Sequence, residues 1–516
     1  MNLQPVSQSM SHEFFQHSRR EHLRMLGGLG LLGLVSDSLF AASVASVQHL
    51  PLTIRHAPEL PLPEGLVTGF GRFGWKSFAV GGEPVLFNGF AGETHVPDDA
   101  DCRLRLTNAV DVRDDHAFEV ATPDGKSIGM LEVRFAALFQ VQEMRVTVKQ
   151  AREVLKQGLV LKMTKGSRPV WFFAPSPEAK PVPDSVQLPH LMVATKGDAA
   201  AQFEQRMRGL VMLQGCGWQS GCVSEGLLDL AEKRQDVALF EAVDRYLGMY
   251  FTEDGVEFES PRSARIKDKV GGIEEPLPWA TLARRKPDHP AVEIGRKFLS
   301  SPGISKDLES PEKELTTEGC YTAAYPMAVL FRVLKRPELA ALALRHLEAR
   351  KKANVHDGDI YQKASAGGSK HLRNWARGVC WYFNGIVRTI QALDDPAAAK
   401  AWQPEMQRVA ELLMKYQRED GLWGNFIHDS ASIADTSGSA GLAAALARAR
   451  ASGWLDERAK QAAQRTLVGL KNHLTPDGLV AGAAQSNKGG ESLQKGTYRT
   501  IYQMGMGLKM QLMAAL

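Results

Sequence analysis

Glu419-Asp420-Gly421-Leu422 closes a stretch of helical apolar spacing, and three similar tetrapeptides close or follow such stretches elsewhere in the chain. They are Glu253-Asp254-Gly255-Val256, His356-Asp357-Gly358-Asp359 and Pro476-Asp477-Gly478-Leu479. Glycine adopts the positive φ that stops a helix, and aspartate readily caps a turn. The last three copies lie 63 and 57 residues apart, which is the length of two helices with their turns. This period predicts a closed or stacked array of helical hairpins.

The helical pattern begins near Gly197. From there onward apolar residues recur with a period of 3.6, as in Val409, Leu412, Leu413 and Tyr416. We therefore expect an (α/α)6 helical toroid over residues 198–516.

Residues 65–197 follow a period of two instead. Leu104 and Leu106 alternate with Arg103 and Arg105, and short strands succeed one another without helices between them. This predicts an antiparallel β-sandwich-like domain whose Arg, Thr and Lys positions form a solvated face. Residues 46–64 are rich in proline and are expected to be a linker. The predicted fold class is therefore α+β and multidomain, as suits a chain of 516 residues.

The amino-acid composition limits the kinds of molecule that the protein is expected to bind. Hydrophobic residues make up 44% and charged residues 23%, as in ordinary soluble proteins. A net charge of +4 with both signs mixed gives no footprint for nucleic acid. The five cysteines lack metal-ligand spacing, so we expect no metal site and buried thiols, with a bridge between Cys216 and Cys222 left open.

The first 45 residues resemble an export signal. Ser18-Arg19-Arg20 precedes an apolar run over residues 25–35, too short to span a bilayer, and small residues follow at 41–45. The paired arginines are similar to those of a twin-arginine signal. We expect residues 1–45 to be removed and the bacterial protein to be exported, periplasmic or secreted, without a membrane-spanning segment. The alternative is a tethering helix that is never cut.

Aromatic and basic side chains lie close together in the sequence at one predicted helix start. Arg377 and Trp381 are four residues apart and share a helix face. Trp375, Lys370 and His371 lie in the loop before them. Cations bind carboxylates and aromatic faces pack on sugar rings, so this cluster suits an acidic oligosaccharide. In the alternative interpretation the tryptophans are core residues and Arg377 sits in a buried ion pair.

Two further helix starts carry candidate site residues. Glu318 follows Thr316 and Thr317, where a carboxylate either caps the helix or transfers protons. Thr436 and Ser437 follow Asp435, where small residues either let a substrate approach the backbone or simply form a cap.

Three motifs together resemble a known group of enzymes. They lie at residues 374–382, 416–423 and 435–440. In this order and spacing they resemble glycoside hydrolase families 88 and 105, the unsaturated uronyl and rhamnogalacturonyl hydrolases, from about residue 202 to the C-terminus. The resemblance implies an (α/α)6 barrel that needs no metal or organic cofactor. It also implies that Arg377 and Trp381 face the sugar.

The reaction implied by the resemblance is a hydration. In those families an aspartate protonates the C4=C5 double bond of the unsaturated uronate and activates a water that attacks C5. The resulting hemiketal opens and expels the neighbouring sugar.

The chain departs from the family pattern at the carboxylates. Glu318 stands where the family has an aspartate, and Asp435 replaces a glutamate. The second family aspartate matches Asp268 loosely, with Glu274 and Glu275 competing for its role.

We therefore expect an exported glycoside hydrolase acting on uronate-containing oligosaccharides, with Glu318 and Asp268 as its catalytic residues. A glycosidase acting on saturated glucuronides through paired carboxylates is one alternative. A catalytically inactive glycan-binding barrel and a structural helical array are the others, and the oligomeric state stays open.

Overall fold

The computed structural model describes residues 47–90, 92, 94–195, 197–306 and 308–516, all within one compact unit. The signal expected over residues 1–45 lies outside this part of the chain and stays a prediction. Among the described residues, no helix has the length and apolar character needed to cross a membrane.

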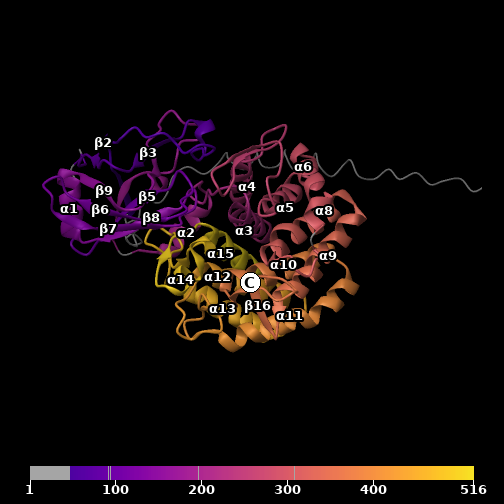
Figure 1. Cartoon of the computed structure of the whole chain (residues 1–516). Helices are drawn as coiled ribbons and strands as arrows, with labels where there is room; N and C mark the ends of the chain where they lie inside the picture. Colours follow the sequence, from indigo (N-terminus) through magenta and orange to yellow (C-terminus); the bar gives the residue numbers. More distant parts are fainter. Residues whose placement is uncertain (1–46, 91, 93, 196, 307) are drawn as a thin grey trace, which may run out of the picture. The chain divides into compact units, whose positions relative to one another are not determined.

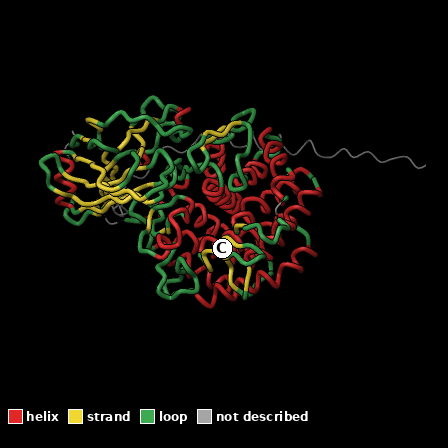
Figure 2. The backbone as a smooth tube through the Cα atoms, viewed as in Figure 1, coloured by secondary structure: helices red, strands yellow, loops and turns green. Residues whose placement is uncertain are grey.

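The N-terminal part, up to residue 195, is rich in antiparallel strands (Figure 2). One sheet has the order β1-β11-β5-β8, a second has the order β2-β4-β9-β6-β7, and β3 pairs with β10. The strands are β1 Val47–Pro51, β2 Ile54–His56, β3 Lys76–Val80, β4 Val85–Phe87, β5 Asp101–Thr107, β6 Asp115–Ala121, β7 Ser127–Arg134, β8 Val141–Val146, β9 Leu159–Lys165, β10 Val170–Ala174 and β11 His190–Ala194.

One apolar core draws on both large sheets. Leu104 and Leu106 of β5 join Phe118 and Val120 of β6 in a single buried cluster. Two sheets that share one core in this way form a sandwich-like layer pair, as the period of two predicts.

Three expectations for this part were wrong. Residues 46–64 are not simply a linker, because β1 pairs with β11 and β2 pairs with β4. A helix, α1 (Val148–Gln157), lies between β8 and β9, where Thr147 and Gln150 form a capping box. Arg103 and Arg105 are buried rather than solvated.

The C-terminal part is mainly helical (Figure 1). Its helices are α2 Ala199–Met207, α3 Trp218–Arg234, α4 Val237–Gly248, α5 Leu277–Arg285, α6 Pro290–Leu299, α7 Pro302–Ser305, α8 Tyr325–Leu334, α9 Pro337–Asn354, α10 Ala376–Leu393, α11 Pro396–Tyr416, α12 Thr436–Ala451, α13 Glu457–Lys471, α14 Gly490–Lys495 and α15 Met504–Ala515. Short strands interrupt them: β12 Glu257–Glu259, β13 Arg265–Lys267, β14 Leu315–Thr316, β15 Val355–His356, β16 Asp359–Ala364, β17 Lys370–Arg373, β18 Ala483–Ala484 and β19 Arg499–Thr500.

Helices α3, α5, α8, α10, α12 and α15 form a closed ring. Each packs against the next, and α15 packs against α3. Helices α4, α6, α9, α11 and α13 each pack against the ring helix that precedes them in sequence. The helical array expected from the Asp-Gly period is therefore present as a closed ring.

The Asp-Gly turns show why the period is visible in the sequence. Gly358, Gly421 and Gly478 have φ of +83°, +79° and +86°, whereas Gly255 is not in the left-handed region. A Cβ at Gly478 would lie 2.3 Å from the backbone nitrogen of Phe203. Glycine is therefore required there both for φ and for space.

The strand-rich part and the helical part share buried surface. Phe70, Phe139 and Phe173 belong to the same apolar cluster as the ring helices. All five cysteines are buried free thiols, so the bridge left open between Cys216 and Cys222 is not formed.

Candidate active site

The ring helices begin at one rim, where four aromatic residues meet. The ring of Trp381, on α10, lies 5.5 Å from that of Trp218 at the start of α3. It stacks on Tyr321 at 6.0 Å and 15°. Tyr502, just before α15, lies 6.0 Å from Trp218. We call these four residues the aromatic cluster; Trp218 is its partly exposed member.

Glu318 lies at the same rim, between β14 and a π-helical turn, Cys320–Ala324, that leads into α8. The amide of Gln362, on β16, donates to both carboxylate oxygens of Glu318, at 2.8 and 3.0 Å. A Cβ at Gly378 would lie 2.8 Å from the Cβ of Gln362. Glycine in the first turn of α10 therefore lets β16 approach closely enough to hold Glu318.

The surroundings of Glu318 favour its protonated form. Burial raises the pKa of Glu318, and the nearby Glu274 carboxylate raises it further, while the hydrogen bonds from Gln362 act in the opposite direction. A carboxyl group with a raised pKa keeps its proton closer to neutral pH, as a general acid requires.

Of the three candidates for the second carboxylate, Glu274 is the one whose charge acts on Glu318. It is exposed, and its carbonyl accepts a 2.8 Å hydrogen bond from the backbone of Trp218. Glu275 is buried, accepts from the backbone of Gly271, and has its pKa raised by burial.

Asp268 has a different environment. It follows β13, is exposed and has a φ of +50°. Its carboxylate lies beside Gly255 in the adjoining turn. Within the described residues no hydrogen bond or ion pair joins Asp268 to Glu318.

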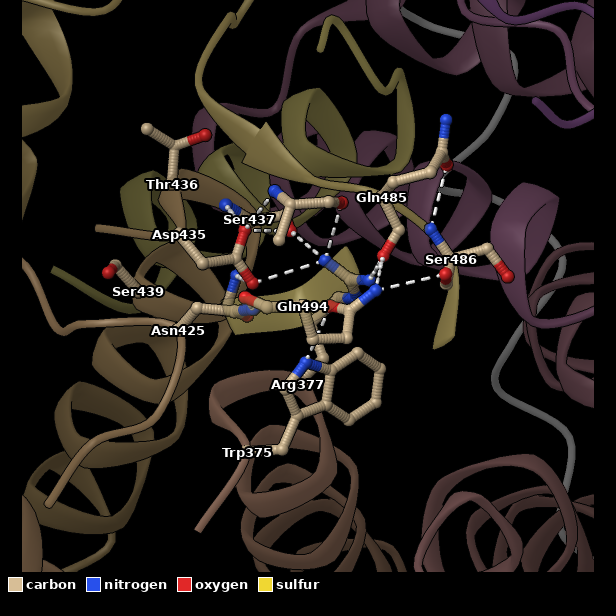
Figure 3. Close-up of polar contacts among 12 residues, drawn as sticks. Trp375, Arg377, Asn425, Asp435, Thr436, Ser437, Ser439, Gln485, Ser486 and Gln494 are labelled. Carbon is tan, nitrogen blue, oxygen red and sulfur yellow. Dashed lines mark hydrogen bonds and ion pairs between the residues drawn. The ribbon is translucent and has the colours of Figure 1, made fainter. Parts of the chain in front are cut away.

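Arg377 is buried, with 1% of its side chain exposed, and Figure 3 shows its polar contacts. Its guanidinium donates to Asp435 at 3.2 Å, to Ser437 at 3.3 Å and to the carbonyl of Ala484 at 2.8 Å. It also lies 4.5 Å from the ring of Trp375. The buried ion pair, one of the two interpretations of the sequence, is therefore the arrangement in the structure.

The neighbouring candidates are buried as well. Thr436 donates to the carbonyl of Ala481 at 2.9 Å, and Ser437 donates to Asp435 at 2.7 Å. Trp375 donates to Gln494 at 3.0 Å (Figure 3). These side chains, with Trp381 at 2% exposure, support the rim from below.

Lys370 and His371 are exposed on β17, which pairs with the strand that carries Gln362. His371 lies 3.0 Å from Glu314, and the ammonium of Lys370 lies 5.6 Å from the ring of Tyr361. The structure thus places both side chains, exposed to solvent, on the sheet that also carries Gln362.

Several residues of the rim could not be predicted from the sequence. Gln362 gives no signal of its own, since it is one polar residue in a short strand. Trp218 and Tyr502 are single aromatic residues outside the motifs.

Comparison with known proteins identifies the helical part. Residues 317–516 match the model of Glycosyl Hydrolase Family 88. This segment is similar to that family. This confirms the resemblance seen in the motifs, and the chain is a glycoside hydrolase. No curated protein matches the chain.

Solved structures of glycoside hydrolases are similar to it at low identity. A possible family 105 member from Salmonella enterica is 18% identical, with a TM-score of 0.49, over 58% of this chain and 82% of that one. A family 105 glycoside hydrolase from C. acetobutylicum is 15% identical, with a TM-score of 0.49, over 61% and 97%. An unsaturated glucuronyl hydrolase from Bacillus sp. GL1 is 16% identical, with a TM-score of 0.42, over 62% and 94%.

Proposed function

We propose that this chain is an exported hydrolase of unsaturated uronyl oligosaccharides, built on an (α/α)6 toroid, with Glu318 as its proton-transferring carboxylate. The observation that carries the proposal is the environment of Glu318. The side chain is held by Gln362, lies at the rim with the aromatic cluster, and has its pKa raised by burial and by Glu274.

The geometry supports the following course. Protonated Glu318 donates its proton to C4 of the double bond, and the carboxylate then accepts a proton from the water that adds to C5. The hemiketal formed at C5 opens and releases the neighbouring sugar. Trp218 is the partly exposed ring at this rim and provides the face on which a sugar packs.

The assay uses oligosaccharides generated by polysaccharide lyases, whose unsaturated ring absorbs in the ultraviolet. Pectic, ulvan and glycosaminoglycan fragments are tested in parallel, and the wild type should abolish the absorbance of at least one class. Glu318→Gln should lower turnover by at least about 10²-fold with little change in stability, as expected for loss of general acid–base catalysis. No loss of absorbance with any fragment would reject hydration.

The second carboxylate is tested by a matched pair of variants. Glu274→Gln should lower activity, because Glu274 acts on Glu318, whereas Asp268→Asn should leave it unchanged. Lost activity in Asp268→Asn with unchanged activity in Glu274→Gln would instead assign the role of second carboxylate to Asp268.

Glu318→Asp tests whether the site is built around the longer side chain. Aspartate would draw the carboxylate back by one methylene, away from the amide that bonds both oxygens of Glu318. We expect at least about a 10²-fold loss, the effect of a misplacement of about 1 Å. A gain in activity would contradict this.

A second candidate is hydrolysis of saturated glucuronides. The charge of Glu274, which acts on Glu318, favours it, since ordinary glycoside hydrolysis uses a pair of carboxylates. Release of sugar from saturated glucuronides, with no activity on unsaturated ones, would establish this candidate instead.

A further inference from the structure

The strand-rich part and the segment between β18 and β19 bring two cations to one aspartate. The ammonium of Lys488 lies 3.6 Å from Asp111, and Arg113 forms a hydrogen-bonded ion pair with the same carboxylate. Asp111 is 4% exposed, whereas Lys488 and Arg113 keep 25% and 40% of their side chains exposed. We call Lys488 and Arg113 the cation pair.

Backbone contacts connect the cation pair to the catalytic rim. The backbone of Asp111 donates to Ser263 at 2.7 Å, in the loop that also holds Pro261. A Cβ at Gly217 would lie 3.2 Å from Pro261 and 3.0 Å from the carbonyl of Glu274. The segment holding Asp111 is thus linked, through this loop, to the start of α3 and to Glu274.

Charge interactions agree with this placement. Burial lowers the pKa of Lys488, while Asp111 and Glu274 both raise it. Since Glu274 also acts on Glu318, one exposed carboxylate lies within electrostatic reach of both Lys488 and the proposed proton donor.

Arg377 fixes the segment that carries Lys488. It donates to the carbonyls of Ala484 and Gln485, and Asp435 accepts from the backbone of Ala484 at 3.0 Å. Gln494 donates to the carbonyls of Gln485 and Ser486 at 2.9 and 3.0 Å (Figure 3). The chain is therefore held firmly up to two residues before Lys488.

A uronate needs a cation within reach of solvent, and Arg377 is too deeply buried to be that cation. We propose that the cation pair, Lys488 and Arg113, binds the carboxylate of the uronate, and that Arg377 is a positioning residue acting through Lys488. The strand-rich part then supplies one side of the substrate site. This inference rests on the proposed function and adds to it the residues that select an acidic sugar.

The first test measures kcat and KM on an unsaturated uronyl disaccharide and on its methyl ester. Lys488→Met and Arg113→Met should each raise KM for the acid by about 10-fold or more, the effect of a lost charge-assisted hydrogen bond, with kcat little changed. The ester carries no charge, so KM for it should be the same in wild type and variants. Lys495→Met, in the same segment, and Arg152→Met, also paired with an aspartate, are matched controls that should behave as wild type.

The second test addresses Arg377. Arg377→Lys keeps the charge but offers fewer directed donors, so it should raise KM for the acid in the wild-type background. In the Lys488→Met background it should add nothing, because its effect passes through Lys488. Equal effects in both backgrounds would overturn the positioning role.

Two outcomes separate this inference from the proposed function. Turnover by the wild type with unchanged KM in both cation variants would overturn the inference alone. Absence of turnover would reject the reaction, and calorimetric titration with free glucuronate would then decide the carboxylate site. The site is supported if Lys488→Met and Arg113→Met lose affinity for glucuronate while the two control variants keep it. The site is overturned if the wild type and all four variants bind glucuronate equally well, or if none of them binds it.

Discussion

Replacing Arg105 by methionine should destabilise the protein severely. Arg105 lies on β5 and is fully buried, and its guanidinium binds both oxygens of Asp477, at 2.6 and 3.0 Å. Asp477 belongs to the last Asp-Gly turn, so this pair ties the strand-rich part to the helical ring. Arg105 also binds Glu143 at 2.7 Å.

The expected loss of unfolding free energy follows from the partners that Asp477 would keep. Burial alone would raise the pKa of Asp477, but Arg105 and His49 hold it well below its usual range. Without Arg105, a fully buried carboxylate would keep, among the described residues, only His49 at 3.1 Å and Thr475 at 2.7 Å as side-chain partners. Removing one partner of a buried pair costs about 3–5 kcal/mol, because the other charge stays buried and unpaired.

Urea unfolding followed by both fluorescence and circular dichroism measures this loss and checks that the two probes agree. Arg105→Met combined with Asp477→Asn should lose less than the sum of the single variants, since both remove the same pair. Arg152→Met, at a largely exposed pair with Asp98, should change stability by less than about 1 kcal/mol. A loss of under about 1 kcal/mol for Arg105→Met would refute the reasoning.

Three further predictions concern stability. Arg388→Met should cost about 1.5–3 kcal/mol in urea unfolding, because it removes a buried charged hydrogen bond while Asp229 keeps Arg284 and Arg448. Exposed Arg332→Met should cost under about 1 kcal/mol. Burial lowers the pKa of His190 to about 3, so the stability given by its neutral form is complete above about pH 6.5 and is lost as the pH falls toward 3. At pH 5 the loss is on the order of 2 kcal/mol, and His190→Gln should show a correspondingly flatter dependence of unfolding free energy on pH. Deleting residues 46–197 should yield insoluble protein, since the strand-rich part shares its core with the ring; a soluble, active fragment would show that the ring folds alone.

The sequence predicts the architecture well where burial follows a single period. The change from a period of two to a period of 3.6 falls where strands give way to helices, between β11 and α2. The period of two did not predict the burial of β5, because both faces of this strand are buried. Leu104 faces the sandwich core, and Arg105 faces the turn that holds Asp477. Periodicity cannot predict which distant charge will cover the second face.

The contacts of the candidate site residues could not be predicted from the sequence. The spacing of Arg377 and Trp381 correctly puts both on one helix, yet the side chains they meet come from other segments. Asp435 lies 58 residues from Arg377, and Gln362 lies 44 residues from Glu318. A local motif indicates where a helix starts, but it does not indicate which residues of distant segments contact that helix.

Two adjacent residues in the first turn of α10 explain how one motif serves the whole site. Gly378 leaves room for Gln362, whose amide holds Glu318, and a Cβ there would force the strand that carries Gln362 outward. Arg377 points to the other side and holds the carbonyls of Ala484 and Gln485, before Lys488. In the proposed reaction the motif therefore need not touch the sugar to be required for catalysis. It contacts the residue that holds the proposed proton donor on one side and the segment of the proposed carboxylate-binding cation on the other.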